Sequence, residues 1–164
     1  QYVPAGLYLT LGFIPGIKKN DFGHRALALA TSWASLAIMV NVLKYSVCEM
    51  RPDGSRRNSF PSGHTATAFM GAELMRIEYG WGIGAGAYAV AATVAFMRLY
   101  NNKHWINDVV AGAGIGILSA QIGYWLLPYT EQILPKKYRY LSSLALTPQS
   151  SFPGRMELAL RIQF

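Results

Sequence analysis

Three short clusters of polar residues have the side-chain types and the spacing needed to handle a phosphate group. They are Lys44 with Arg51 and Pro52, then Pro61-Ser62-Gly63-His64, then Arg98 with His104 and Asp108. Each cluster alone is unremarkable, because surface charges, a turn and a His–Asp pair on one helix face are all common. Together, in this order and at the ends of apolar blocks, they indicate one site.

The first requirement of phosphate ester hydrolysis is positive charge around a dianion. Lys44, Arg51 and Arg98 can supply it, and the planar guanidinium fork suits phosphate oxygens. Ser62 adds a hydroxyl, and Gly63 lets its backbone N–H approach a ligand without a side chain in the way. Ser62 and Gly63 also stand at the start of an expected helix, where free N–H groups favour an anion.

The second requirement is a nucleophile and an acid for the leaving oxygen. His104 and Asp108 are four residues apart at a helix start, so they share a face. Asp108 can accept from one ring nitrogen, which fixes the tautomer and leaves the other nitrogen free to attack phosphorus. His64 is then placed to donate a proton to the leaving group.

These clusters resemble the signature of the PAP2 (type 2 phosphatidic acid phosphatase) superfamily: K-x6-R-P, then P-S-G-H, then S-R-x5-H-x3-D. That superfamily contains membrane lipid phosphatases, soluble bacterial acid phosphatases and vanadium haloperoxidases. The resemblance implies that a basic set holds the phosphate, that His104 forms a phosphohistidine, and that His64 protonates the leaving group. The basic set is Lys44, Arg51, Ser62, Gly63 and Arg98. The resemblance also implies no metal and no cofactor, while Met97 departs from it, standing where the family usually has Ser.

Four apolar blocks must position these clusters, and we expect each to form a helix. They cover residues 26–43, 63–79, 81–97 and 105–127, and Pro128 is expected to end the last one. Small residues at four-residue spacing, Gly82 with Gly86 and Gly112 with Gly116, favour close helix packing in a membrane. A tightly packed soluble helical core is the alternative. Residues 3–14 are apolar but too short to span a bilayer, so we expect an interfacial segment or the end of a longer helix.

The composition agrees with an all-α, integral-membrane helical bundle. Hydrophobic residues make up 52% of the chain, charged residues only 14%, and the net charge is +7. A basic chain can bind nucleic acid, anionic lipid or a phosphorylated substrate. No nucleic-acid motif is present, so a membrane and a lipid phosphate are the expected partners.

The C-terminal tail has a different pattern from the rest of the chain. We place the helical phosphatase domain at residues 1–135 and the tail at 136–164. Residues 156–164 alternate apolar and other side chains with period two, as a strand does. A terminal hairpin is therefore expected, with 141–147 as partner strand and 148–154 as turn.

The functional hypothesis is a metal-independent phosphatase acting on a lipid phosphate monoester or diphosphate. Candidate substrates are phosphatidate, a phosphatidylglycerol phosphate, an isoprenyl diphosphate and a lipid A phosphate. The alternatives are a soluble periplasmic acid phosphatase, a vanadate-dependent haloperoxidase, and a non-catalytic membrane protein that binds anionic lipid. Basic residues at the helix ends away from the site predict the inner membrane, with the site facing the periplasm. They are Lys18, Lys19, Arg25, Lys136, Lys137 and Arg139.

Overall fold

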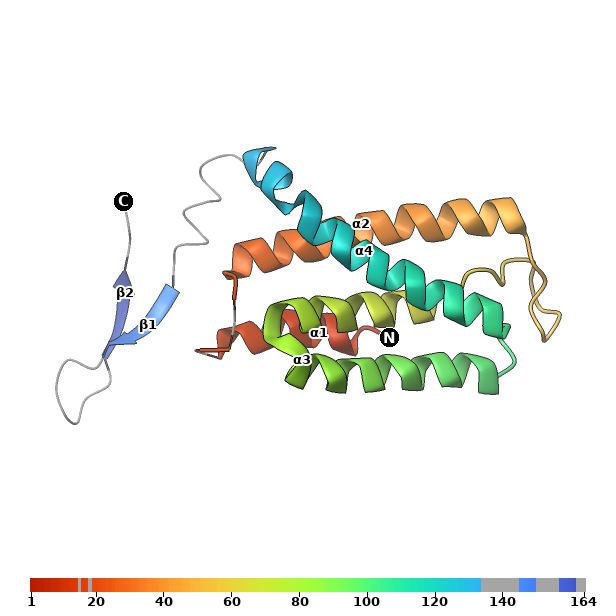
Figure 1. Ribbon diagram of the computed structural model, residues 1–164, viewed down its shortest axis with the longest axis horizontal. Coiled ribbons are helices and arrows are strands. Elements are labelled where there is room, and N and C mark those ends of the chain that lie inside the picture. The colour runs from red at the N-terminus through yellow and green to blue at the C-terminus, as the bar shows by residue number, and fades with distance from the viewer. Residues whose placement is uncertain (15, 18, 134–144, 150–156, 162–164) are drawn as a thin grey trace.

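The computed structural model describes residues 1–14, 16–17, 19–133, 145–149 and 157–161. The helices form a bundle, in which α2 (Phe22–Val47), α3 (Gly63–Tyr100) and α4 (Ile106–Ile133) are the long members (Figure 1). A short helix α1 (Val3–Thr10) and a 3₁₀ turn η1 (Leu11–Phe13) precede them. The predicted all-α bundle is confirmed, and three helices are long and apolar enough to cross a membrane.

Helix α3 is a helical hairpin rather than one straight rod. At Gly80 the backbone adopts φ 81° and ψ −178°, a conformation essentially restricted to glycine. The chain reverses there, so residues 63–79 and 81–100 form two antiparallel arms (Figure 1). The arms pack closely, since a Cβ at Gly84 would lie 2.8 Å from the Arg76 Cα. The two predicted helices 63–79 and 81–97 are therefore present, with Gly80 as the break between them.

The prediction that Pro128 ends the last helix was wrong. Helix α4 continues through Pro128 to Ile133. A proline inside a helix removes only one backbone donor, and helices in apolar surroundings often retain it because neighbouring groups adjust. Helix α2 also extends beyond the predicted 26–43, and it ends where Cys48 takes a left-handed conformation at φ 48°.

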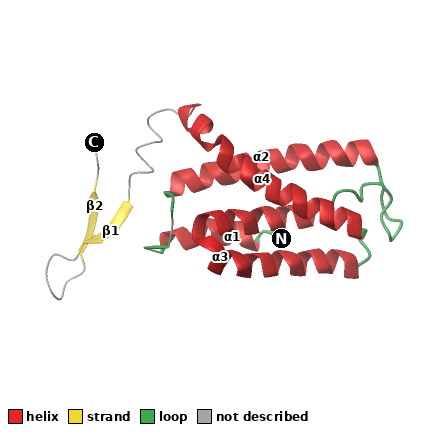
Figure 2. Cartoon of the chain, in the orientation of Figure 1, coloured by secondary structure: helices red, strands yellow, loops and turns green. Residues whose placement is uncertain are grey.

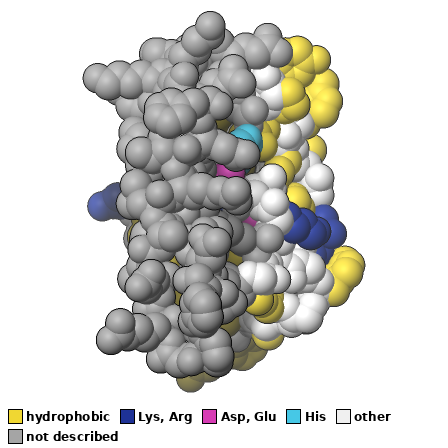
Figure 3. All heavy atoms as spheres, turned by 90° about the vertical axis from the view of Figure 1, so that its left-hand side faces the viewer, with side chains coloured by type: hydrophobic (Ala, Val, Ile, Leu, Met, Phe, Trp, Pro, Cys, Tyr) yellow, Lys and Arg dark blue, Asp and Glu magenta, His cyan; other side chains and the backbone are white. Residues whose placement is uncertain are grey.

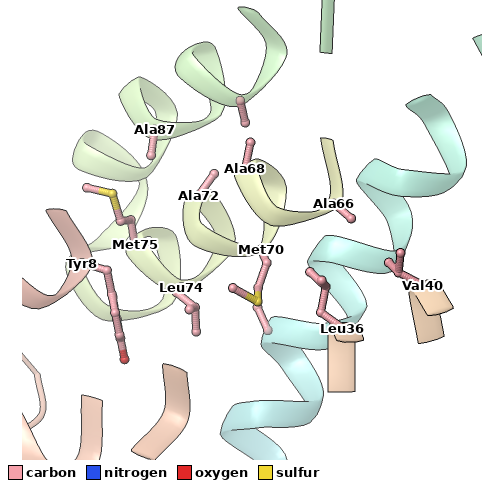
Figure 4. Close-up of a cluster of buried hydrophobic side chains, with 12 residues drawn as sticks. Tyr8, Leu36, Val40, Ala66, Ala68, Met70, Ala72, Leu74, Met75 and Ala87 are labelled. Carbon is pink, nitrogen blue, oxygen red and sulfur yellow. The ribbon is translucent and has the colours of Figure 1, made fainter. Parts of the chain in front are cut away.

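The N-terminal segment packs against the bundle, and whether it is an interfacial segment or the end of a longer helix stays a prediction. Helix α1 crosses the first arm of α3 so closely that a Cβ at Gly71 would lie 2.7 Å from the Ala5 backbone nitrogen. Tyr8 is fully buried, and it borders a cluster of mostly small side chains with Met70 and Leu74 (Figure 4). The sequence indicated the length of this segment but not its packing partners.

Two short strands follow α4. Strands β1 (Ala145–Gln149) and β2 (Glu157–Arg161) pair antiparallel, with Leu146 opposite Leu160 (Figure 2). A hairpin is therefore present, but its first strand lies further along the chain than expected. Pro148, predicted in the turn, pairs with Leu158 instead. Residues 141–144, 150–156 and 162–164 lie outside the described residues, and the division into domains at residue 135 stays a prediction.

Candidate active site

The eight predicted site residues lie at one end of the bundle, which we call the site end. This end carries the loop 48–62 and the connection 101–105, at the right of Figure 1. Lys44 lies near the C-terminal end of α2. The two arms of α3 run in opposite directions, so the first and the last residues of α3 both lie at the site end. The reversal at Gly80 therefore places Gly63 and Arg98 together although 34 residues separate them in the sequence.

A single cavity of about 350 Å³ collects most of these residues. Its lining includes Lys44, Arg51, Gly63, His64 and His104. The three other predicted site residues are not part of this lining. Ser62 and Asp108 are fully buried, and Arg98 is half-buried.

The predicted His–Asp pair is formed. The Nδ1 atom of His104 lies 3.3 Å from Oδ2 of Asp108, and both side chains are buried. The backbone N–H of Trp105 donates to the same carboxylate oxygen at 2.9 Å, and the backbone N–H of Ser62 donates to the Asp108 carbonyl at 3.0 Å. An ionised carboxylate can only accept, so Nδ1 carries the proton and Nε2 keeps its lone pair.

The electrostatics of the site favour a neutral His104. Burial lowers the pKa of His104, and the nearby charges of Lys44 and Arg51 lower it further. The hydrogen bond and the charge of Asp108 act in the opposite direction. The net effect is a pKa below the ordinary value for histidine, so the ring is uncharged at neutral pH and able to act as a nucleophile.

The cations of the site are organised by a residue that the sequence did not point to, Asn58. Its backbone carbonyl accepts from Lys44 Nζ at 2.8 Å, and its side-chain Oδ1 accepts from Arg51 Nε at 3.0 Å. Asn58 also lines the cavity. It lies between two motifs in a loop, where neither periodicity nor spacing distinguishes it from its neighbours.

Arg98 has a buried Nε atom with no hydrogen-bond partner within the described structure. A buried donor without a partner is costly, and a bound phosphate oxygen would satisfy it. Arg98 does not line the cavity, so its phosphate-binding role stays a prediction. Its neighbour Met97 is 44% exposed and is not among the cavity-lining residues, so the methionine replaces the family Ser outside the cavity itself.

Ser62 and Gly63 form the start of α3. Ser62 is the N-cap, and its hydroxyl accepts from the backbone N–H of Thr65. A Cβ added to Gly63 would meet only Val40, at an ordinary 3.8 Å. A Cβ at this position would therefore fit beside Val40, which lines the same cavity as Gly63.

The residues between positions 1 and 133 that the structure describes contain no group of three His, Cys, Asp or Glu side chains able to hold a metal. The positive charge facing the cavity comes from Lys44 and Arg51. The arrangement suits in-line transfer of a phosphoryl group to a histidine nitrogen.

Along α2 the cavity has a part lined mainly by apolar side chains, with the polar Gln1 and Asn41 beside them, which we call the apolar channel. Tyr2, Trp33, Leu36, Ala37 and Val40 line this part. The rings of Tyr2 and Trp33 stack there, with centroids 6.0 Å apart. Trp33 precedes Lys44 by eleven residues, so the channel follows α2 for roughly 16 Å at 1.5 Å per residue.

Comparison with known proteins agrees with this geometry. The sequence profile of the PAP2 superfamily matches residues 53–132, which hold the second and third clusters and begin just after Arg51-Pro52. A lipid A 1-phosphatase of Porphyromonas gingivalis is 43% identical over 131 residues, covering 77% of this chain and 29% of that protein. A PA-phosphatase related-family protein of Dictyostelium discoideum is 26% identical over 142 residues, covering 70% of this chain and 52% of that protein.

This chain thus spans less than a third of the first relative and about half of the second. No solved structure matches it significantly. The profile match contains the histidines and the aspartate of the cavity, and the first relative covers most of the chain at high identity. We conclude that the chain belongs to the PAP2 superfamily.

Proposed function

We propose that this protein hydrolyses a phosphate monoester or diphosphate of a lipid through a phosphohistidine on His104. One observation supports this most directly. The cavity has a basic, histidine-bearing end and an apolar channel along α2, so it has complementary surfaces for the two halves of a lipid phosphate.

The proposed chemistry uses only side chains of this site. The lone pair of His104 Nε2 attacks phosphorus while the bond from phosphorus to the leaving oxygen breaks, and His64 gives that oxygen a proton. Lys44, Arg51 and Arg98 balance the negative charge of the transferring phosphoryl group. Water then attacks the phosphohistidine with its proton passing to His64, which releases inorganic phosphate and restores both histidines.

The apolar channel favours a lipid over a soluble phosphate ester. The rings of Tyr2 and Trp33 and the side chain of Leu36 are large apolar surfaces that can remove an acyl or isoprenyl chain from water. The name of the Porphyromonas relative adds a specific candidate, the 1-phosphate of lipid A. We therefore rank lipid A phosphate first, followed by phosphatidate, phosphatidylglycerol phosphate and isoprenyl diphosphate.

Phosphate release from purified protein tests the proposal. The panel comprises the four lipid phosphates and one soluble ester, p-nitrophenyl phosphate, with and without EDTA, and with vanadate. We expect turnover of at least one lipid phosphate, no loss with EDTA, and inhibition by vanadate as a mimic of five-coordinate phosphorus. Loss with EDTA that magnesium restores would contradict the metal-free chemistry.

Two variants separate the histidine roles. His104→Ala should abolish turnover and any trapped phosphoenzyme, and near-normal activity would refute the mechanism. His64→Ala should still form phosphoenzyme from p-nitrophenyl phosphate, because a good leaving group needs little acid assistance. If the wild-type protein shows no turnover, and if His104→Ala binds lipid phosphate as tightly as wild type does, the non-catalytic alternative would be supported instead.

We also propose that the site end faces the periplasm of a Gram-negative inner membrane. Arg25 no longer supports this, because it is buried and donates to the carbonyls of Tyr8 and Leu9. Lys19 is exposed at the opposite end, where Figure 3 shows Lys or Arg side chains. Lys18, Lys136, Lys137 and Arg139 lie outside the described residues, so the positive-inside argument now rests on fewer known positions.

Cysteine labelling tests this orientation in a background that lacks Cys48. Arg57→Cys at the site end should react with a membrane-impermeant thiol reagent in intact spheroplasts. Lys19→Cys at the opposite end should react only after lysis. The reverse pattern would place the site in the cytoplasm.

A further inference from the structure

We propose that Ser59 is a positioning residue of this site, which holds the carboxylate of Asp108 in place beneath the nucleophilic ring of His104. The inference rests on the proposed function, since it concerns how the proposed nucleophile is oriented. Ser59 belongs to none of the three sequence clusters, and only Phe60 separates it from the Pro-Ser-Gly-His cluster.

The contact between Ser59 and Asp108 is fully enclosed. The Oγ of Ser59 donates to Oδ2 of Asp108, and both side chains are completely buried. Because an ionised carboxylate has no proton to give, the hydroxyl must be the donor. The backbone N–H of Ser59 donates to the Glu49 carbonyl at 2.9 Å, and this bond holds the Ser59 backbone in place.

Ser59 acts on the same oxygen that orients the histidine. Oδ2 of Asp108 receives the Ser59 hydroxyl, the Trp105 backbone N–H and Nδ1 of His104. Trp105 and His104 are on the same chain segment as Asp108, whereas Ser59 comes from the loop before α3. Among these donors Ser59 therefore ties the His–Asp pair to the loop that carries Arg51 and Asn58.

The Ser59 hydroxyl is expected to change the protonation of His104. It takes up part of the Asp108 carboxylate charge and competes with His104, whose Nδ1 lies 3.3 Å from the same oxygen. Removing the hydroxyl would strengthen the pull of Asp108 on the His104 proton. The ring would then stay protonated to higher pH, and it would lose a fixed orientation.

Other charged groups around this pair must be considered in any pH experiment. Lys44 from α2, Arg51 and Glu49 from the loop, and His64 and Arg98 from α3 all interact with the pair or with each other. Burial and the charge of Asp108 raise the pKa of the Glu49 carboxyl. None of these groups changes in a Ser59 variant, so each is common to variant and wild type.

A pair of nearly equal-sized substitutions tests the proposal in the full chain. Ser59→Thr keeps the hydroxyl, and Ser59→Val has almost the same shape without it, so steric effects of the added methyl are shared. We expect Ser59→Val to lower kcat roughly ten- to a hundredfold, as for loss of a hydrogen bond to a charged group, relative to Ser59→Thr. Its activity should also rise at higher pH than that of the threonine variant, with p-nitrophenyl phosphate as the common substrate.

The outcomes separate the possibilities. Equal activity and equal pH profiles for the threonine and valine variants would overturn the positioning role. An equal loss in both with an unshifted profile would also overturn it, since that pattern reports only disturbed packing. If wild-type protein releases no phosphate from any member of the panel, the proposed function itself has failed. An active wild type with indistinguishable variants rejects the inference about Ser59 alone.

Discussion

Helix α4 touches the start of α3 at Gly112, and this contact allows a demanding test of how the site is assembled. A Cβ added at Gly112 would lie 2.6 Å from the backbone oxygen of Ser62. Ordinary contact begins near 3.4 Å, so Gly112→Ala must separate the two backbones by about 0.8 Å. No flexible side chain can absorb this shift, because the group that must move is backbone.

The separation acts directly on the proposed chemistry. The Ser62 N–H donates to the Asp108 carbonyl at 3.0 Å, and Asp108 lies one turn before Gly112 on α4. A shift of this size would stretch that bond beyond hydrogen-bonding range. It would also move His104 and Asp108 away from Ser62 and Gly63, which we propose bind the phosphate. Overpacking of this kind costs about 1–3 kcal/mol of stability, and a displacement near 1 Å can cost about a hundredfold in rate.

Gly114→Ala is the matched control, because a Cβ there meets no atom within 4 Å. The assay compares kcat/KM and the thermal midpoint in detergent for both variants. We expect Gly112→Ala to lose roughly ten- to a hundredfold in kcat/KM, and Gly114→Ala to stay near wild type. Wild-type kcat/KM in Gly112→Ala would refute the reasoning, because it would show that the helices adjust without disturbing the site.

Three further predictions follow from other parts of the molecule. Asn58→Leu removes the side-chain acceptor of Arg51 Nε and keeps the backbone carbonyl that accepts from Lys44. The KM for the lipid phosphate should therefore rise about tenfold while kcat changes less, and an unchanged KM would contradict this. Activity should fall as the pH drops through the pKa of His104, because the protonated ring cannot attack phosphorus. Since the pKa of His104 is lowered, this fall should lie below the ordinary histidine value of about 6.5, and a fall above that value in the pH–rate profile would contradict the assignment. Arg25→Met leaves the Leu9 carbonyl without its donor at the opposite end, so it should cost about 1–3 kcal/mol of stability in chemical denaturation without changing KM.

The parts of the fold that could be predicted from sequence are those that follow from hydropathy and from glycine. Four apolar blocks were located, and Gly80 between two of them is where the chain reverses. Hydropathy could not show that the 3–14 segment packs into the bundle, because that depends on the shape of Gly71 and Pro4 at a crossing. It also misjudged Arg25, since a buried arginine with carbonyl partners looks the same in sequence as one at a membrane surface.

The candidate site shows the same division. His104, Asp108 and His64 could be predicted as site residues because the proposed chemistry needs particular side chains at fixed spacing, and the structure brings His104 and Asp108 into contact. Asn58 and Ser59 were missed because they act through hydrogen bonds that only the folded loop brings about. A loop residue that accepts from a cation or donates to a carboxylate carries no periodic signal. Such residues become visible only when their partners are known.

The first arm of α3 carries charges that have consequences for how the protein enters a membrane. Glu73 is buried in the middle of the arm and accepts from Arg76 at 2.6 Å, from Tyr88 of the second arm at 2.6 Å, and from Gln121 of α4. An unpaired charge at a helix centre costs about 2.5–3.5 kcal/mol on insertion. Arg76 lies in the same arm and can pair with Glu73 at once, whereas Tyr88 and Gln121 belong to segments that are synthesised later. We expect the first arm to settle fully in the bilayer only when its hairpin mate and α4 have emerged and completed these contacts.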